Sequence, residues 1–509
     1  MPRTIELTGD DLTLGDVWDV AVLGTHARLA DSARVRMRAA RSLVESVRGE
    51  HTYGVNTGFG RFVSAHIPEE LAEELQLRLL RSHACGVGEP YPDDVVRAAM
   101  LLRANTLAKG YSGARVETEE LLIECLNRGV LPLVPSRGSV GASGDLAPLA
   151  HLALPLVGEG EALVGGERLV GAEALARVGL EPIQLASKEG LSLVNGTQFM
   201  AAMAALAVVR ARRLAATADL ACAQSLEALQ GSRTSFVPAV HRSRPLKGQQ
   251  EAAANIWRLL EGSAIIESHR WCDKVQDAYS LRCAPQVHGA CRDLLDYVQA
   301  TVEIELNAAT DNPLVLVDEG DIVSAGNFHG QPLAFALDAL AMAVAELASI
   351  SERRIERLVN PSLSDGLPPF LVEEGGLNSG FMIPQYVAAA LVSENKVLAH
   401  PASVDSIPTS AGQEDHVSMG NAAGLKALRV LENAEHTLAI ELLAGAQAVE
   451  FLAPLVPGEG VRLTHGFVRS LSPRLHEDRS LAREIERVAG AIRTGELLAA
   501  VEVELGALA

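Results

Sequence analysis

Three small residues in a row, Ala142-Ser143-Gly144, stand before Asp145 at the end of a Gly- and Ser-rich loop that starts at Pro132. Small residues let the backbone bend tightly enough for the Gly144 nitrogen to attack the Ala142 carbonyl. Loss of water, including the Ser143 hydroxyl, then leaves an exocyclic methylene on a five-membered ring, which is a strong electrophile. A helix that starts at Asp145 would present N–H donors and a positive dipole end to that ring. The same residues also suit an ordinary turn into a helix.

A second loop, at 51–60, sets Tyr53 among three glycines. It is not a phosphate-binding loop, because no Gly-Lys-Ser or Gly-Lys-Thr follows. A phenol held near the positive ends of dipoles loses its proton more readily and can act as a general base. Tyr53 is therefore a candidate base, with a hydrogen-bonded packing role as the alternative.

The second half of the chain carries polar residues that a helical scaffold does not need. Asn195 stands just before the longest stretch without Gly or Pro. Gln276, Tyr279 and Arg282 are spaced three apart, which predicts neighbouring turns of one helix. An arginine fork binds carboxylates well and suits an amino acid or organic acid, although a surface ion pair is the alternative for Arg282.

Two further segments complete the candidate chemistry. Phe328 lies in a glycine-flanked aromatic loop at 326–330. Glu414 lies in the polar run 413–416. A carboxylate there suits acid–base work or the binding of a cationic group, and a solvated turn is the alternative.

These segments carry a family resemblance. The run 141–149 resembles the prosthetic-group signature of the aromatic amino acid ammonia-lyases, whose members make 4-methylideneimidazole-5-one (MIO) autocatalytically from Ala-Ser-Gly. The resemblance covers essentially the whole chain. Its other motifs occur in the same order at 53–60, 103–113, 195–197, 310–313 and 326–330.

Within that family the chain is most similar to the histidine branch. Ser82-His83 occupies the substrate-selectivity pair, where phenylalanine lyases carry Phe-Leu and tyrosine lyases His-Leu. The runs 393–396, 400–410 and 413–419 also resemble that branch. The resemblance implies a carbon–nitrogen lyase that converts L-histidine to trans-urocanate and ammonia. Gln331 departs from the acidic residue that many members of the branch carry, which bears on the finer substrate preference.

Two other functions stay open at this point. One is a lyase or 2,3-aminomutase that acts on tyrosine or phenylalanine with the same prosthetic group; the Ser82-His83 pair argues against it. The other is a non-catalytic helical scaffold, which the intact Ala142-Ser143-Gly144 opposes.

The resemblance also assigns roles to individual positions. Ala142, Ser143 and Gly144 would form MIO. The catalytic residues would be Tyr53, as the base for the β-proton, with Tyr279 and Glu414. The substrate-binding residues would be His83, Asn195, Gln276, Arg282 and Phe328. Arg282 would pair with the substrate carboxylate, His83 and Glu414 would hold the imidazole, and Phe328 would pack against the prosthetic group.

No metal or soluble cofactor is expected, and the family assembles its site from several subunits of a homotetramer. Two reaction schemes fit these residues: amine addition followed by elimination, and attack on the ring by the substrate side chain.

The elements that must position these residues are expected to be helical. Helices are predicted from Asp31 with a stop at Gly49, from Pro68, and over 93–109, with a hairpin near 163–170. Long Ala- and Leu-rich helices are predicted at 197–230, 333–360, 385–400 and 425–444.

The long helices are apolar nearly all round, so they must be buried, and a bundle shared between subunits is favoured. The expected fold class is all-α, with an N-terminal domain at 1–194 that includes a minor β-hairpin. A long-helix bundle and C-terminal helical domain at 195–509 follow it. The resemblance implies a fumarase/aspartase-like architecture.

Composition agrees with a soluble helical protein. The 509 residues include 44 basic and 64 acidic side chains, a net charge of 44 − 64 = −20, with 48% apolar and 4% aromatic residues. The negative charge argues against nucleic acids and anionic membranes as partners. The N-terminus lacks a signal-peptide pattern, and no apolar run of about 18 residues stands out. A cytoplasmic location is expected.

Overall fold

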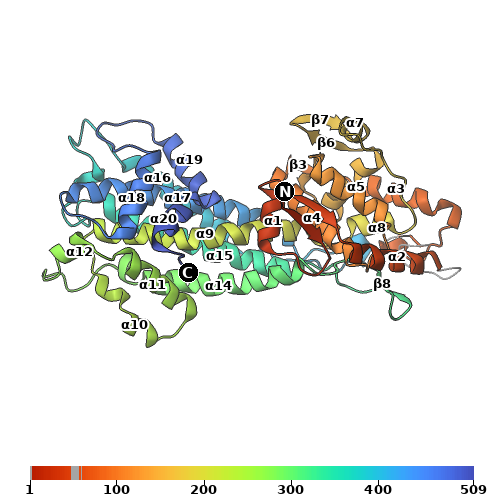
Figure 1. The fold of residues 1–509 in the computed structure, drawn as a ribbon, viewed down its shortest axis with the longest axis horizontal. Helices are drawn as coiled ribbons and strands as arrows, with labels where there is room; N and C mark the ends of the chain where they lie inside the picture. Colours follow the sequence, from red (N-terminus) through yellow and green to blue (C-terminus); the bar gives the residue numbers. More distant parts are fainter. Residues whose placement is uncertain (1–2, 47–56, 59) are drawn as a thin grey trace. The chain divides into compact units, whose positions relative to one another are not determined.

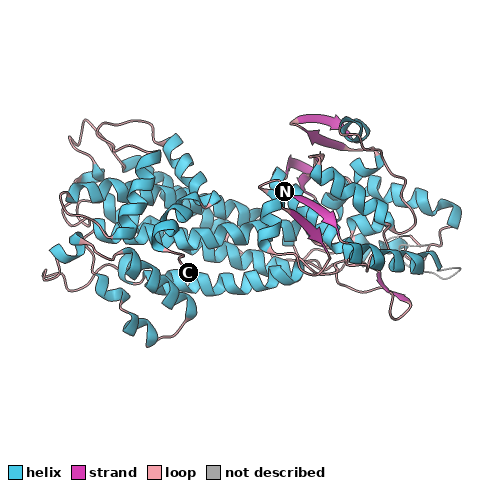
Figure 2. Cartoon of the chain, viewed as in Figure 1, coloured by secondary structure: helices cyan, strands magenta, loops and turns pink. Residues whose placement is uncertain are grey.

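The computed structural model describes residues 3–46, 57–58 and 60–509. Helices make up most of it, and the strands form small separate sheets (Figure 2). The expected mainly helical fold class is confirmed. The helices are α1 (Leu14–Ala21), α2 (Asp31–Ser46), α3 (Ala72–His83), α4 (Asp93–Ala108), α5 (Val116–Asn127), α6 (Leu146–Ala153), α7 (Gly171–Arg177), α8 (Glu189–Val194), α9 (Gln198–Ala228), α10 (Pro238–Arg242), α11 (Lys247–Leu259), α12 (Ala264–Ser268), α13 (Tyr279–Arg282), α14 (Ala284–Glu305), α15 (Gln331–Val359), α16 (Met382–Leu398), α17 (Gly420–Val449), α18 (Glu459–Leu471), α19 (Ala482–Thr494) and α20 (Glu496–Leu505). The strands are β1 (Thr4–Leu7), β2 (His26–Leu29), β3 (Val87–Pro90), β4 (Leu131–Pro132), β5 (Pro135–Arg137), β6 (Glu161–Val164), β7 (Glu167–Val170), β8 (Leu314–Leu316) and β9 (Asp321–Val323).

The chain forms two compact units. Unit 1 comprises Met1–Val209, Gln299–Asp338 and Pro401–Leu425, and unit 2 comprises Arg210–Val298, Ala339–His400 and Lys426–Ala509. The units are discontinuous because α9, α14, α15 and α17 each run through both. The division into domains at 1–194 and 195–509 remains a proposal about the chain's organisation.

The N-terminal elements follow the sequence pattern closely. Helix α2 begins at Asp31 as predicted, whereas the stop expected at Gly49 lies outside the described residues. Helix α4 spans nearly the whole predicted range. After Pro68 the chain makes a 3-10 turn and then enters α3. Strands β6 and β7 form the expected hairpin, with Val164 opposite Glu167 across a two-residue glycine turn.

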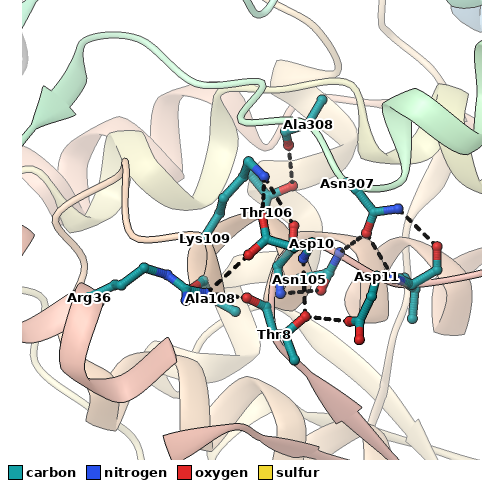
Figure 3. A network of polar contacts seen from close by, with 12 residues as sticks. Thr8, Asp10, Asp11, Arg36, Asn105, Thr106, Ala108, Lys109, Asn307 and Ala308 are labelled. Carbon is teal, nitrogen blue, oxygen red and sulfur yellow. Dashed lines mark hydrogen bonds and ion pairs between the residues drawn. The ribbon is translucent and has the colours of Figure 1, made fainter. Parts of the chain in front are cut away.

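One pair of strands was not predicted. Strands β1 and β2 pair in parallel, in a register that runs from Thr4 opposite His26 to Leu7 opposite Leu29. Figure 3 shows how the loop after β1 is fixed to the end of α4. The Gly9 N–H donates to Asn105 Oδ1 (3.0 Å), and Lys109 Nζ lies 2.5 Å from Asp10 Oδ1.

The long helices are mostly where they were expected, and Figure 1 shows α9 and α15 as continuous rods. Helix α9 has 31 residues, which corresponds to about 46 Å. Helix α17 is longer than the predicted 425–444, because it continues through the glycines on either side. A Cβ on Gly424 would lie 2.4 Å from Met203 Cε, so this glycine allows close packing rather than ending the helix.

Helix α16 is an exception to the expected burial of the long helices. Ile383, Tyr386 and Val397 are all more than half exposed within this single chain. Helix α15, by contrast, contains an 18-residue window of mean hydropathy 1.9, long and apolar enough to cross a membrane. The expectation that no apolar run of about 18 residues stands out is wrong for this helix. Of that window 72% is buried, as in the core helix of a soluble protein.

Candidate active site

The Ala142-Ser143-Gly144 turn is held against the segment that follows α8. The Gly196 N–H donates to the Ser143 carbonyl (3.2 Å), and the Asp145 N–H donates to the Gly196 carbonyl (2.7 Å). Gly144 has φ +77°, and a Cβ there would lie 2.0 Å from the Gly196 oxygen. Only glycine fits this position, and its absent side chain gives the tight backbone that cyclisation requires.

Asp145 precedes α6 as predicted, but its carboxylate makes no capping hydrogen bond to that helix within the described residues. It instead accepts from the Met200 N–H (2.9 Å), in the first turn of α9, and from the Ser139 hydroxyl (3.1 Å). Burial raises the pKa of Asp145 to about 6, and these hydrogen bonds oppose the shift. The carboxylate thus serves the N-terminus of α9, where a negative charge is favourable.

Unit 1 contains a cavity of about 1320 Å³ next to this turn. It brings together six of the residues predicted from the sequence, which come from five separate segments of the chain. They are His83, Ala142, Ser143, Asn195, Phe328 and Glu414.

Glu414 is a hydrogen-bond partner of the Ser143 hydroxyl. Its Oε1 accepts from Ser143 Oγ (3.3 Å), and its Oε2 accepts from Thr409 Oγ1 (2.6 Å). The Thr409 N–H also donates to the Glu414 carbonyl (2.9 Å). Thr409 was not predicted as a site residue; it holds the carboxylate oxygen that Ser143 does not contact. The one signal for it in the sequence is its place in the loop before Glu414.

His83 stands at the end of α3 and lines the same cavity. Its Nδ1 lies 2.9 Å from the Leu79 carbonyl and 3.0 Å from Ser82 Oγ. Burial lowers the pKa of His83, so the ring is neutral at pH 7. With Nδ1 donating to Leu79, Nε2 can accept a hydrogen bond.

Asn195 is buried at the cavity wall beside Gly196. Its Nδ2 donates to the Asn312 carbonyl (2.9 Å), and its backbone carbonyl accepts from Arg103 Nη2 (2.9 Å). Gln331, the departure from the histidine branch, donates from Nε2 to the Ser403 carbonyl (3.0 Å) and does not line the cavity in the described part of the chain.

Three predicted site residues belong to unit 2 and do not line this cavity among the described residues. Tyr279 and Arg282 share the short helix α13, and the Arg282 guanidinium lies 4.5 Å from the Tyr279 ring centroid. Gln276 precedes that helix, so the prediction that all three lie on neighbouring helical turns is wrong for Gln276. Arg282 Nε donates to the Asp277 carbonyl (2.9 Å), which orients the guanidinium.

Tyr53, the candidate base, lies outside the described residues.

The chain is similar to known proteins of one family. The family model described as aromatic amino acid lyase matches residues 12–470. A histidine ammonia-lyase of Gloeobacter violaceus is 58% identical over 504 residues, which cover 99% of this chain and 98% of the relative.

Solved structures of related enzymes have a similar fold. A histidine ammonia-lyase of Trypanosoma cruzi has a TM-score of 0.91 at 46% identity, covering 98% of this chain and 95% of its own. A tyrosine aminomutase of Streptomyces globisporus has a TM-score of 0.94 at 39% identity, covering 99% of both chains. The chain therefore belongs to the aromatic amino acid lyase family.

Proposed function

We propose that this chain is a histidine ammonia-lyase, which removes ammonia from L-histidine without oxidation and releases trans-urocanate. The full-length relatives that carry this name support the assignment. The observation that carries it is the presence of His83 and Glu414 on the wall of the cavity that contains Ser143.

Those two side chains suit an imidazole. His83 Nε2 can accept a hydrogen bond, because Nδ1 is engaged with the Leu79 carbonyl. The Glu414 carboxylate accepts as well, and Thr409 holds it in place. A neutral imidazole ring has one N–H donor, which an acceptor on this cavity wall can bind, whereas a phenyl ring has no donor to offer.

We also propose that Ala142, Ser143 and Gly144 form MIO. The close approach of Gly144 to Gly196 and the hydrogen bond from the Gly196 N–H to the Ser143 carbonyl fit such a ring. When present, this group supplies an electrophilic methylene for the amine. Phe328 would pack against it, and Asn195 would lie beside it.

The remaining roles complete the proposal. Tyr53 would remove the β-proton, and Arg282 would pair with the substrate carboxylate, with Gln276 and Tyr279 beside it. We propose that these three unit 2 residues reach the cavity from another copy in a homotetramer. The exposed apolar side chains of α16 support such an assembly, because a long apolar face is stable in water only when covered. We place the enzyme in the cytoplasm.

The test is to incubate the purified protein separately with L-histidine, L-tyrosine and L-phenylalanine and to follow the conjugated acrylate by ultraviolet absorbance. Histidine should give by far the largest rate. A larger rate with tyrosine or phenylalanine, or a β-amino acid product, would instead support an aromatic lyase or an aminomutase.

A further inference from the structure

Lys188 is a fully buried cation close to the candidate site, and the proposed chemistry does not use it. Its exposed fraction is 0%, and it immediately precedes α8 with φ +69°. A non-glycine residue rarely adopts that conformation, and a buried ammonium is costly unless it is paired. Both the backbone conformation and the burial of the charge therefore need an explanation beyond the start of a helix.

The ammonium has three hydrogen-bond acceptors. Lys188 Nζ donates to the Ser112 carbonyl (2.8 Å), to Ser192 Oγ (3.3 Å) and to Asp311 Oδ2 (3.3 Å). Both members of the Lys188–Asp311 pair are fully buried.

The surrounding charges act in opposite directions on this pair. Burial lowers the pKa of Lys188, the Asp311 carboxylate opposes that shift, and the cations Arg103 and Arg41 add to it. The charge of the Asp145 carboxylate also acts to raise the pKa of Arg103. Asp311 is thus the anion that pairs with the buried ammonium.

The second oxygen of Asp311 faces Asn195. Asp311 Oδ1 accepts from the Asn312 N–H (2.7 Å) and from Asn195 Nδ2 (3.4 Å). Asn195 Nδ2 also donates to the Asn312 carbonyl (2.9 Å). Both hydrogens of the Asn195 amide are therefore engaged by acceptors that Lys188 holds in place through Asp311.

The other end of that amide is left without a partner. Asn195 is 2% exposed and lines the cavity, and its Oδ1 has no hydrogen-bond partner among the described residues. A buried acceptor is costly when unpaired, so this oxygen is suited to a donor that arrives with a ligand. Asn195 is also next to Gly196, which pairs with the Ser143-Gly144 backbone.

We propose that the Lys188–Asp311 pair is a positioning device for Asn195. It holds the amide with its nitrogen toward Asp311 and its oxygen free to accept a hydrogen bond from the amino group of an amino-acid substrate. This inference rests on the proposed function and deepens it, because it assigns an acceptor for the amine and the residues that orient that acceptor.

Asp311→Asn tests the orientation. Lys188 would take the oxygen of the new amide, so its NH2 group would face Asn195 Nδ2. Two donors cannot pair, and the Asn195 amide should turn its oxygen away from the cavity. In a Ser143→Ala background, where no turnover occurs, calorimetry should show L-histidine binding weakened about tenfold. In the otherwise unchanged enzyme kcat per folded molecule should fall about tenfold to a hundredfold.

The double variant Lys188→Met/Asp311→Asn should restore binding to within about threefold of the parent. Without the ammonium, the amide at position 311 can turn its oxygen toward Asn195 again. Asp10→Asn is the matched control, because Asp10 forms a Lys–Asp pair with Lys109 in the same unit (Figure 3). It should leave histidine binding and kcat unchanged.

Unchanged histidine binding in Asp311→Asn, or a double variant no better than the single one, would overturn the proposal. If Asp311→Asn does not fold, Lys188→Met gives a second arm. Without the ammonium, Asp311 loses the partner that holds its carboxylate, so histidine binding in the Ser143→Ala background should weaken, and the further change Asp311→Asn should restore it. Unchanged histidine binding in Lys188→Met would overturn the proposal.

The two proposals fail in different ways. A parent protein that does not convert histidine contradicts the proposed function. The same variants then test the positioning of Asn195 with the amino acid that the parent does convert.

Discussion

Asp145 in unit 1 and Asp219 in unit 2 are both fully buried aspartates, yet their surroundings shift their pKa values in opposite directions. Burial raises the pKa of Asp145 to about 6, opposed mainly by hydrogen bonds from uncharged donors. Burial also acts to raise the pKa of Asp219, but Arg292 and His288 outweigh it and the pKa is lowered. The difference lies in the neighbours and not in the depth of burial.

The two aspartates also differ in their surroundings, although each region leaves a buried polar atom without a partner among the described residues: Arg292 Nε near Asp219 and Asn195 Oδ1 near Asp145. Both oxygens of Asp219 have partners: Oδ1 lies 2.7 Å from His288 Nδ1, and Oδ2 lies 2.6 Å from Arg292 Nη2. Arg354 likewise donates to both oxygens of Glu441. The region of Asp145, in contrast, adjoins a cavity and includes the unpartnered Asn195 oxygen. Buried charge alone therefore does not indicate reactivity; unused hydrogen-bonding capacity at a cavity does.

The largest expected effect comes from a pair of serine variants, one in each region. Ser143→Ala should lower turnover more than about a thousandfold with little change in stability, because no electrophilic methylene can form. Ser225→Ala, which removes a donor to the buried Glu441 (2.7 Å), should cost about 1–2 kcal/mol of stability and leave turnover per folded molecule intact. Ultraviolet assay and urea unfolding measure both quantities. Full activity in Ser143→Ala would contradict the prosthetic-group proposal.

Asp219→Asn should destabilise the protein by about 3–5 kcal/mol, because it leaves Arg292 and His288 buried without their anion. Asp296→Asn is the control in the same unit: that carboxylate pairs with Lys247 (2.7 Å) but is 35% exposed, so about 1 kcal/mol or less is expected. Urea unfolding measures the free energy lost in each variant. Equal losses would mean that the buried ion pairs of Asp219 stabilise the protein no more than the partly exposed pair of Asp296.

His83→Leu should reduce kcat/KM for histidine about a hundredfold and alter the free energy of unfolding by no more than about 1 kcal/mol. The change removes an acceptor from the cavity wall while keeping an apolar body at the end of α3. Steady-state kinetics with the three aromatic amino acids measures the effect. Histidine kinetics equal to those of the parent would show that the imidazole binds elsewhere.

The two aspartates should also differ in how the stability of the protein depends on pH. Folded Asp145 binds its proton more tightly than the unfolded chain does, so its ionisation costs stability. The stability that protonated Asp145 contributes should therefore decrease as pH rises from 3.8, the usual pKa of an aspartate, to about 6. The expected loss is up to about 1.4 kcal/mol per pH unit. Asp219 has the opposite sign: its stabilisation is present above 3.8 and is lost as pH falls through the lowered folded pKa.

Urea unfolding across this pH range measures both slopes. Asp145→Asn should flatten the slope between about pH 4 and 6, and an unaltered slope there would show that another group titrates.

The fold was predictable where the spacing of apolar residues and the positions of Gly and Pro indicate the same helix. Helices α2, α4 and α9 follow directly from spacing, caps and the absence of Gly and Pro. The parallel pair β1 and β2 was not, because each strand has only four residues and the pairing is not local. The extent of α17 was missed because Gly424 resembles a helix end, whereas its contact with Met203 is a tertiary one.

The candidate site was predictable where residue type carries the chemistry, as in Ala142-Ser143-Gly144 and Glu414. Supporting residues were not: the burial of Lys188 and its pairing with Asp311 depend on segments more than a hundred positions apart. No local pattern distinguishes such a lysine from an exposed one. Thr409 escaped for the same reason, since its hydroxyl matters only through the carboxylate that it holds.

The central claim is that the Ala142-Ser143-Gly144 turn reacts with itself, and the mass of that segment tests it most directly. A proteolytic peptide that contains residues 138–151 should weigh two water molecules less than its sequence requires. The same peptide from Ser143→Ala should weigh at most one water molecule less than its own sequence requires, because the substituted residue has no hydroxyl to eliminate. A parent peptide with the unmodified mass, in protein that converts histidine at full rate, would contradict the account.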